Sequence, residues 1–199
     1  MTVGVTALEK PLPKPRKDLL GYASARALEA LVEALLALYF LDKGYTRNAA
    51  GKAFLAWRAL TGALLALCAE KIAGRLESEE EKKWLLEKAI PKIPTTRLKT
   101  LAMLVQRACV PDYSFYTSTA LDLHDYQYHG PDPDLELSKY RSRREAALDI
   151  IQLLGKLAVI IEKHLKPRLE EEKQWTTDHE EVLDKLKQGL EVHQNPHRR

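Results

Sequence analysis

The chain has 199 residues, of which 45% are hydrophobic and 30% charged, a balance that suits one globular domain with an appended arm or tail and excludes global disorder. Its net charge of +3 is too small to indicate a nucleic-acid-binding protein by itself. The two cysteines exclude a disulfide-rich secreted scaffold, and sparse Asn, Cys and Met beside abundant Glu, Lys and Arg favour a thermophilic source.

The two cysteines, Cys68 and Cys109, each lie within an apolar helical pattern. The favoured interpretation is two buried thiols that act as small hydrophobic side chains, and one disulfide between them is the alternative. Neither cysteine has a partner at C-x-x-C spacing, so no zinc site through cysteine is predicted.

No secretion signal or membrane span is predicted. The N-terminus lacks a cationic start followed by an apolar stretch. The most apolar window, residues 28–41, carries Glu33 and is shorter than the ~20 residues that a span needs. We therefore expect a soluble cytoplasmic protein with no membrane partner.

The first segment, residues 1–16, is predicted to be an extended arm. Pro11, Pro13 and Pro15 alternate with other residues, and each proline fixes φ and removes an amide donor. Recognition of this arm by a proline-binding partner is the alternative interpretation.

A helix is predicted over residues 17–42, where apolar residues recur at steps of three and four. Glu29 and Glu33 form only a narrow polar stripe on it. Such a helix must be buried on most sides, by neighbouring helices or by a second subunit. On this ground we predict a homodimer or larger assembly.

Three further helices are predicted before residue 111. Residues 46–76 follow a possible Thr46 cap, and regularly spaced alanines along them permit close helix packing. Ser78 and Glu81 form a capping box for a short helix that ends at residue 90. Pro91 and Pro94 are expected to break the chain before a helix over residues 95–110.

In the C-terminal half, the apolar pattern predicts a helix over residues 117–128, a long helix from 138 or 142 to 165, and a short helix over 177–190. Gly130-Pro131-Asp132-Pro133 ends the first, and Pro167 interrupts the second. The apolar side chains of the third are expected to dock on the bundle or on a second subunit: Val182, Leu183, Leu186 and Leu190.

The absence of any alternating strand pattern makes the predicted fold class all-α. We expect an up-and-down bundle of four to five long helices over residues 17–166. The arm over 1–16 precedes it, and a C-terminal extension over 167–199 follows, with a loose polar tail from residue 193.

Candidate acid–base residues lie in the stretch LHDYQYHGPDP, residues 123–133. Histidine as a residue type titrates near neutral pH, which makes His124 and His129 candidates, and Asp125, four residues before His129, is expected to orient the His129 ring and raise its pKa. A metal site at these three residues is a weaker alternative because helical histidine ligands usually stand four apart. The alternative is that these histidine and aromatic side chains only close the end of the bundle by hydrogen bonds to the loop and take part in no reaction.

Candidate phosphate-binding residues flank this stretch. Arg141, Arg143 and Arg144 begin the last long helix, where cations oppose the helix dipole and need either the acidic run 132–136 or a phosphate as partner. Tyr128, on the His124 face, belongs to the same candidate surface.

A second candidate anion site is the start of the helix at residue 46. Arg47 and Lys52 stand in its first two turns, where free backbone amides can hold an anion. The alternative is that these residues only cap the helix and face solvent. No P-loop or other cofactor motif is present.

The segments RNAAGKAFLAW (residues 47–57) and LHDYQYHGPDP resemble the archaeal PaREP family, which is similar to the wider HEPN superfamily of helical bundles. The likeness extends over about residues 17–165. It implies an up-and-down bundle that commonly dimerises. Many HEPN members are ribonucleases of toxin–antitoxin or antiviral systems, or pair with a nucleotidyltransferase.

The chain departs from the active HEPN ribonucleases, which place an Arg before a His with four to six residues between. None of its six histidines has an Arg at that distance, although His124 and His129 have a gap of four with His in the Arg position. Imidazolium is a poorer phosphate clamp than guanidinium.

The predicted function is therefore binding of RNA or a nucleotide by a degenerate or non-standard ribonuclease-type module. A non-enzymatic module that pairs with a nucleotidyltransferase through the arm or residues 177–190 is the alternative, followed by a metal-dependent enzyme. Because residues 130–133 must reverse the chain tightly, we expect His124, His129 and Arg141 to converge, with Arg47 or Lys52 nearby.

Overall fold

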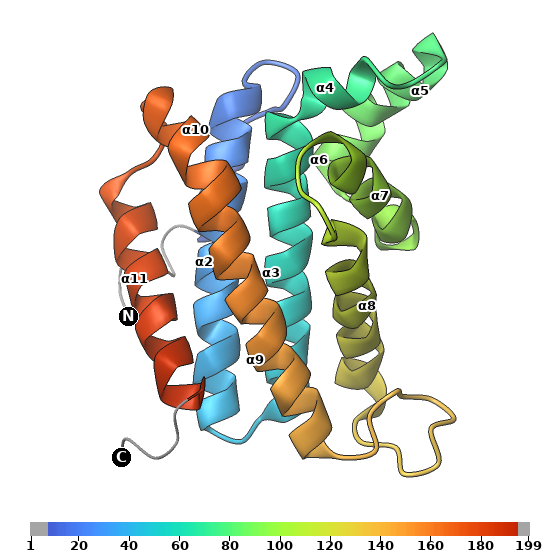
Figure 1. The fold of residues 1–199 in the computed structure, drawn as a ribbon, viewed down its shortest axis with the longest axis vertical. Coiled ribbons are helices and arrows are strands. Elements are labelled where there is room, and N and C mark those ends of the chain that lie inside the picture. The colour runs from blue at the N-terminus through green and yellow to red at the C-terminus, as the bar shows by residue number, and fades with distance from the viewer. Residues whose placement is uncertain (1–7, 195–199) are drawn as a thin grey trace.

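The computed structural model describes residues 8–194 as a bundle of helices (Figure 1). Successive long helices run in alternating directions along the long axis of the molecule. No strand occurs among residues 8–194, so the all-α, up-and-down prediction is confirmed. The long helices are α2 (Leu19–Asp42), α3 (Thr46–Leu67), α8 (Tyr113–His129), α9 (Arg143–Ile160) and α11 (Thr177–Gln194).

Shorter elements complete the top of the molecule in Figure 1. They include two π-helical turns, η1 and η3, and one 3₁₀ turn, η2. Their bounds are α4 (Ala69–Ala73), α5 (Glu79–Trp84), η1 (Leu85–Ala89), α6 (Ile90–Lys92), η2 (Thr95–Arg97), α7 (Leu98–Ala108), η3 (Ile161–Leu165) and α10 (Lys166–Glu171).

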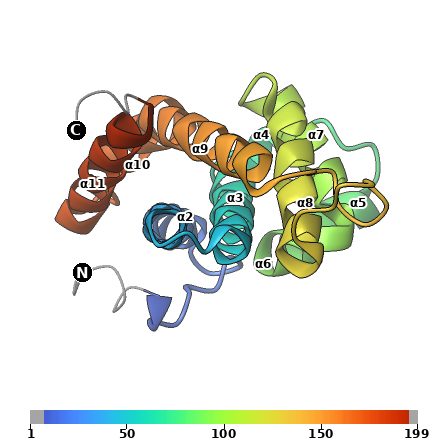
Figure 2. The ribbon, with the colours of Figure 1, turned by 90° about the horizontal axis from the view of Figure 1, so that it is seen from below.

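Helix α3 is the centre of the bundle, with α2, α8 and α9 packed around it (Figure 2). The alanines of α2 and α3 are almost all fully buried, which lets these two helices approach closely. Against α8, the buried Trp57 donates a hydrogen bond to Thr117 Oγ1 (2.9 Å). Large side chains with satisfied polar atoms therefore fix α8 beside α3.

By length and composition α3 is also apolar enough to cross a membrane. However, 78% of its most apolar window is buried among the other helices. Its apolar character is thus that of a core helix.

Of the three prolines expected to break helices, Pro94 does so, in extended backbone before η2, but the other two lie inside helical segments, contrary to the prediction. Pro91 lies in α6 directly after η1, and Pro167 lies in α10 directly after η3. A proline removes one backbone donor and crowds the carbonyl four residues earlier, and the wider π turn relieves both conflicts. The last long helix therefore continues through η3 and α10 to Glu171 instead of ending at residue 165.

The predicted caps divide into two that form and one that does not. The Ser78 hydroxyl accepts a hydrogen bond from the Glu81 amide, as does the hydroxyl of Ser142 from the Glu145 amide, where Ser142, Arg143, Arg144 and Glu145 also form the sequence of a capping box. Thr46 does not cap its helix: the N-cap residue of α3 is Tyr45, and no side chain caps it.

Cys68 and Cys109 form a disulfide, with their Cα atoms 6.6 Å apart. The interpretation as two buried thiols is therefore wrong. Cys68 ends α3 where one helix to residue 76 was expected, and Cys109 ends α7. The bond joins the ends of these helices, which neither helical pattern reveals alone.

The apolar surface of α2 is covered within one chain. Helices α3, α9 and α11 all pack on α2, and the four apolar side chains of α11 expected to dock are at most 5% exposed. The narrow polar stripe of α2 thus requires no second subunit, and the homodimer stays a prediction without that support. Helix α11 also extends to Gln194, beyond the predicted end at residue 190.

Of the predicted arm, residues 11–14 carry no regular secondary structure, and Arg16 forms an ion pair with Glu87 (3.0 Å). Residues 1–7 of the arm and 195–199 of the predicted loose tail lie outside the described residues.

His179 connects α11 to α2 in its neutral form. Its Nε2 lies 2.9 Å from the Ser24 carbonyl oxygen, which can only accept, so Nε2 carries the hydrogen. Its Nδ1 accepts a hydrogen bond from the Thr176 amide (3.2 Å). Burial lowers the pKa of His179, because the charged ring would lose its hydration and that amide bond.

We expect the free energy of unfolding to fall as the pH drops below about 6.5. There the unfolded chain protonates its histidine while folded His179 stays neutral, so the unfolded state binds more protons. One such group contributes at most about 1.4 kcal/mol per pH unit. Urea unfolding at pH 7.5 and 5.5 measures this slope.

His179→Gln should flatten the slope, and the same change at the less buried His164, whose pKa is also lowered by burial, should flatten it less. An unchanged slope in His179→Gln would show that this residue is not the titrating group.

Candidate phosphate-binding end of the bundle

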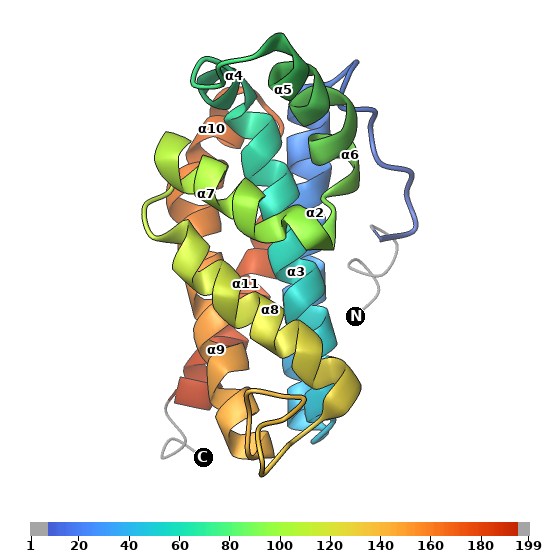
Figure 3. The same cartoon turned by 90° about the vertical axis from the view of Figure 1, so that its right-hand side faces the viewer.

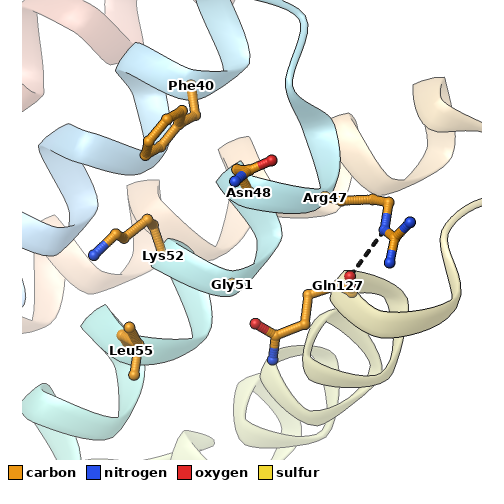
Figure 4. A pocket seen from close by; sticks show the side chains of 7 residues that line it. All are labelled: Phe40, Arg47, Asn48, Gly51, Lys52, Leu55 and Gln127. Atoms are coloured by element: carbon orange, nitrogen blue, oxygen red, sulfur yellow. Dashed lines mark hydrogen bonds between the residues drawn. The ribbon is translucent and has the colours of Figure 1, made fainter.

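Three parts of the chain meet at one end of the bundle: the α2–α3 turn, the C-terminal end of α8 and the start of α9 (Figures 1 and 3). Arg47, in the first turn of α3, donates from Nε to the carbonyl oxygen of Gln127 (2.9 Å) and from Nη2 to that of Tyr128. The first of these bonds is drawn in Figure 4. Arg47 thus supplies donors to carbonyls that the end of α8 leaves unpaired.

Arg143 ties the start of α9 to the same place. It donates from Nη2 to the carbonyl oxygen of Gly44 and from Nε to Thr46 Oγ1 (3.4 Å). A cavity of about 220 Å³, here called the turn cavity, lies beside these contacts. Its lining includes Thr46, Arg47, Asn48, Tyr126 and Arg143.

Tyr126 also lines the turn cavity, and its hydroxyl has no hydrogen-bond partner among residues 8–194. The side chain is fully buried, with its ring edge-on to Tyr140 at 5.4 Å. Burial raises the pKa of Tyr126, while the nearby charges of Arg143 and Arg47 act to lower it. The hydroxyl is therefore protonated, close to two guanidinium groups, and free to donate.

The amides at the start of α3 are also unpaired. The backbone N–H groups of Thr46, Arg47 and Asn48 form no hydrogen bond with any described residue, because Tyr45 provides no side-chain cap. A helix of 22 residues directs its positive dipole end toward these amides. They are well suited to an anion.

The positive charge at this end is not neutralised by the protein. No carboxylate among residues 8–194 lies within 4.0 Å of the guanidinium of Arg47, Arg141, Arg143 or Arg144. The acidic run 132–136 does not serve as partner: Asp132 accepts hydrogen bonds from backbone amides such as Leu137 (2.6 Å), which lower its pKa.

Lys52 differs from these arginines, because it forms an ion pair with Glu33 (2.8 Å). Its charge is compensated, so it is a weak candidate for holding a phosphate.

The two candidate histidines lie in different surroundings. His124 stacks on Phe54 of α3, with ring centroids 4.1 Å apart, and its Nδ1 contacts the Gln127 carboxamide. Burial lowers the pKa of His124, so the ring is neutral. His129 is exposed at the end of α8. Within residues 8–194, neither imidazole forms a hydrogen bond with an arginine, so the expected pair of imidazoles beside several cations stays a prediction without that support. Arg47 does reach the end of α8 that carries His129.

The remaining candidates in this stretch are exposed. No hydrogen bond or ion pair joins Asp125 to His129 in the described part of the chain, so the expected orientation of His129 is not seen. No group of three or more His, Cys, Asp or Glu among residues 8–194 is placed to hold a metal, which leaves the metal-dependent alternative without a site. Tyr128 is 63% exposed and lies edge-on to His124.

The sequence reasoning missed Tyr126. Its position in the pattern indicates only a buried side chain, and the lack of a partner for its hydroxyl depends on how α8, α9 and the α2–α3 turn meet. The segment around Arg47 was singled out, but not its bonds to α8, because a contact between residues 80 apart has no local signal.

The model of a protein family described as Archaeal PaREP1/PaREP8 family matches residues 25–151. No curated protein and no solved structure matches the chain. The matched range contains the first turns of α3, all of α8 and the start of α9, and so includes every residue of the turn cavity discussed above.

Proposed function

The chain belongs to the archaeal PaREP1/PaREP8 family, and we propose that it binds a phosphate group of RNA or of a nucleotide at the turn cavity. The observation that carries the proposal is the Tyr126 hydroxyl, which is buried without a partner beside Arg47 and Arg143. Leaving a buried hydroxyl unsatisfied costs about 1–3 kcal/mol. A phosphate oxygen would accept its hydrogen bond.

Two further features support an anion in this place. The amides at the start of α3 offer donors of the kind that hold phosphate at helix N-termini. Arg47, Arg141, Arg143 and Arg144 supply uncompensated positive charge, which attracts a polyanion from a distance and makes the affinity fall with salt.

Recognition is better supported than cleavage. The Arg-to-His spacing of active HEPN ribonucleases is absent, and the Nδ1 atom of His124 is taken by Gln127. We therefore place the chain as a degenerate or non-standard ribonuclease-type module. Its likeness to the HEPN superfamily, a toxin–antitoxin or defence context and assembly as a homodimer belong to this proposal.

Pairing with a nucleotidyltransferase is less well supported. One of the two contact surfaces suggested for it, the apolar face of α11, is buried on the bundle.

The proposal is tested by Tyr126→Phe. We expect the variant to fold with a free energy of unfolding unchanged or raised by about 1 kcal/mol, because an unpaired buried hydroxyl is removed. Its affinity for single-stranded RNA at low salt should fall, because one donor to phosphate is lost. Isothermal titration calorimetry with RNA and with inorganic phosphate measures the affinity, and urea unfolding measures the stability.

Tyr140→Phe is the matched control. Its hydroxyl already donates to Asp149 (2.8 Å), so this variant should lose stability and keep its affinity for RNA. Arg144→Gln removes an exposed charge and should lower the salt dependence of RNA binding by about one phosphate contact. The proposal is wrong if the wild-type protein binds neither RNA nor phosphate, or if Tyr126→Phe binds both as tightly as the wild type.

A further inference from the structure

A second cavity lies next to the turn cavity at the first turns of α3, and Figure 4 shows the residues that line it. Its volume is about 460 Å³, and it lies between the end of α2, the start of α3 and α8. Arg47 and Asn48 line both cavities, so the two are neighbours along one surface. We call it the side cavity.

The walls of the side cavity are apolar on one side and carry carboxamides on the other. The ring of Phe40 and the side chain of Leu55 form the apolar part. Asn48 makes no side-chain hydrogen bond within residues 8–194, and Gln127 uses only its Nε2 atom, toward His124. Free carboxamide atoms therefore face a space bordered by an aromatic ring.

Gly51 permits this arrangement. A Cβ atom at this position would come 2.5 Å from Gln127 Oε1, so any other residue would displace the Gln127 carboxamide. The glycine in the RNAAGKAFLAW segment thus keeps one wall of the cavity in place.

The charge of the side cavity differs from that of the turn cavity. Apart from Arg47, which the two cavities share, the cation in its lining is Lys52, and the ion pair with Glu33 compensates that charge. The space is therefore unsuited to a second phosphate. An aromatic wall and neutral amide groups are the features that hold a nucleobase, by stacking on the ring and by hydrogen bonds to the base edges.

We infer that the ligand is a phosphorylated nucleoside whose phosphate occupies the turn cavity and whose base occupies the side cavity, with Arg47 and Asn48 between them. This inference rests on the proposed function and adds to it a site for the base of the ligand. The same chemistry is offered by a free nucleoside monophosphate and by the terminal nucleotide of single-stranded RNA.

Calorimetric titration of the full chain tests the inference. The probes are inorganic phosphate, the four nucleosides, the four nucleoside monophosphates, and a short RNA with or without a terminal phosphate. We expect at least one monophosphate to bind about tenfold or more tightly than inorganic phosphate, an advantage typical of one stacked base. If RNA is the source, its terminally phosphorylated form binds more tightly than the free monophosphate, and otherwise it does not.

Phe40→Ala should remove the advantage of the monophosphate and leave the affinity for inorganic phosphate unchanged. Phe40→Leu, which keeps more of the apolar volume, covers the case in which the alanine variant does not fold. Phe115→Ala is the matched control, since this ring is 67% exposed at the opposite end of α8 and its loss should change neither affinity.

The outcomes separate the two proposals. Phosphate binding with no monophosphate more than twofold tighter overturns the base site and leaves the turn cavity standing, as does an equal loss of both affinities in Phe40→Ala. Binding of neither phosphate nor any nucleotide overturns both.

Discussion

A chain that stops after Glu172, and so lacks α11, is expected to lose most of its stability. Four apolar side chains of α11 are almost completely buried on α2 and α9: Val182, Leu183, Leu186 and Leu190. Their burial is worth about 1.5–3 kcal/mol each, as an upper estimate. The total is comparable to the whole stability of an ordinary domain. The melting temperature by circular dichroism should therefore fall steeply, and the newly exposed α2 should favour aggregation.

Single substitutions in α11 separate the effect of lost side-chain packing on stability from the effect of removing the whole segment. Leu186→Ala, at a fully buried position, should cost about 2–5 kcal/mol. Val192→Ala in the same helix, where the side chain is 46% exposed, should change the stability by no more than about 0.5 kcal/mol. If the truncated chain melted at the same temperature as the full chain, α11 would be an appendage and its buried face would carry no stability.

The ion pairs between α11 and the bundle carry little of this effect. Lys187 and Glu162 approach to 2.7 Å, as do Lys166 and Glu180, but all four side chains remain partly exposed to solvent. Such pairs contribute about 0–1 kcal/mol. Gly189 permits α11 to pack closely on α2, because a Cβ atom there would lie 2.9 Å from the Leu38 side chain.

The helical periodicity of the sequence was enough to predict the long helices and their approximate bounds. Each buries one apolar face, and that face repeats in the sequence with the helical period. The errors occur where a local rule competes with tertiary packing. Pro91 and Pro167 are accommodated by π turns, and α8 begins at Tyr113, four residues before the predicted start, after Asp112 in a left-handed conformation.

The candidate site was predictable in its location and not in its chemistry. The chain reverses after Gly130 and so brings the end of α8 near the start of α9, as the order of the residues predicts, but it does so through a loop over residues 130–142 instead of a tight turn. Which side chains face one another does not follow. Arg143 turns toward Gly44 instead of the acids that follow Gly130, and His124 turns inward onto Phe54.

The structural roles of Arg47 and Arg143 are compatible with a role in binding. Each uses two nitrogen atoms on backbone or hydroxyl oxygens, which holds the guanidinium in one orientation. A group that is already oriented loses less conformational entropy when a ligand arrives. The same contacts that close the end of the bundle therefore prepare it for an anion.

Reduction of the Cys68–Cys109 disulfide is expected to lower the free energy of unfolding by about 4 kcal/mol, from the entropy of closing a loop across a sequence separation of 41 residues. The loop contains α4 to α7, which pack at one end of the bundle (Figure 1). The bond restricts the unfolded chain and ties α7 to the end of α3. Urea unfolding with and without a phosphine reductant measures the difference.

A disulfide does not by itself place the chain outside the cell, because intracellular proteins of hyperthermophilic archaea are rich in such bonds. The variant in which both cysteines are replaced by alanine is the control: it should be as unstable as the reduced protein and insensitive to the reductant. Intact-mass measurement before and after alkylation shows whether both thiols are engaged. If the oxidised wild type reacts fully with the alkylating agent, or if the reductant leaves its unfolding curve unchanged, then the bond does not support the packing of α7 on α3.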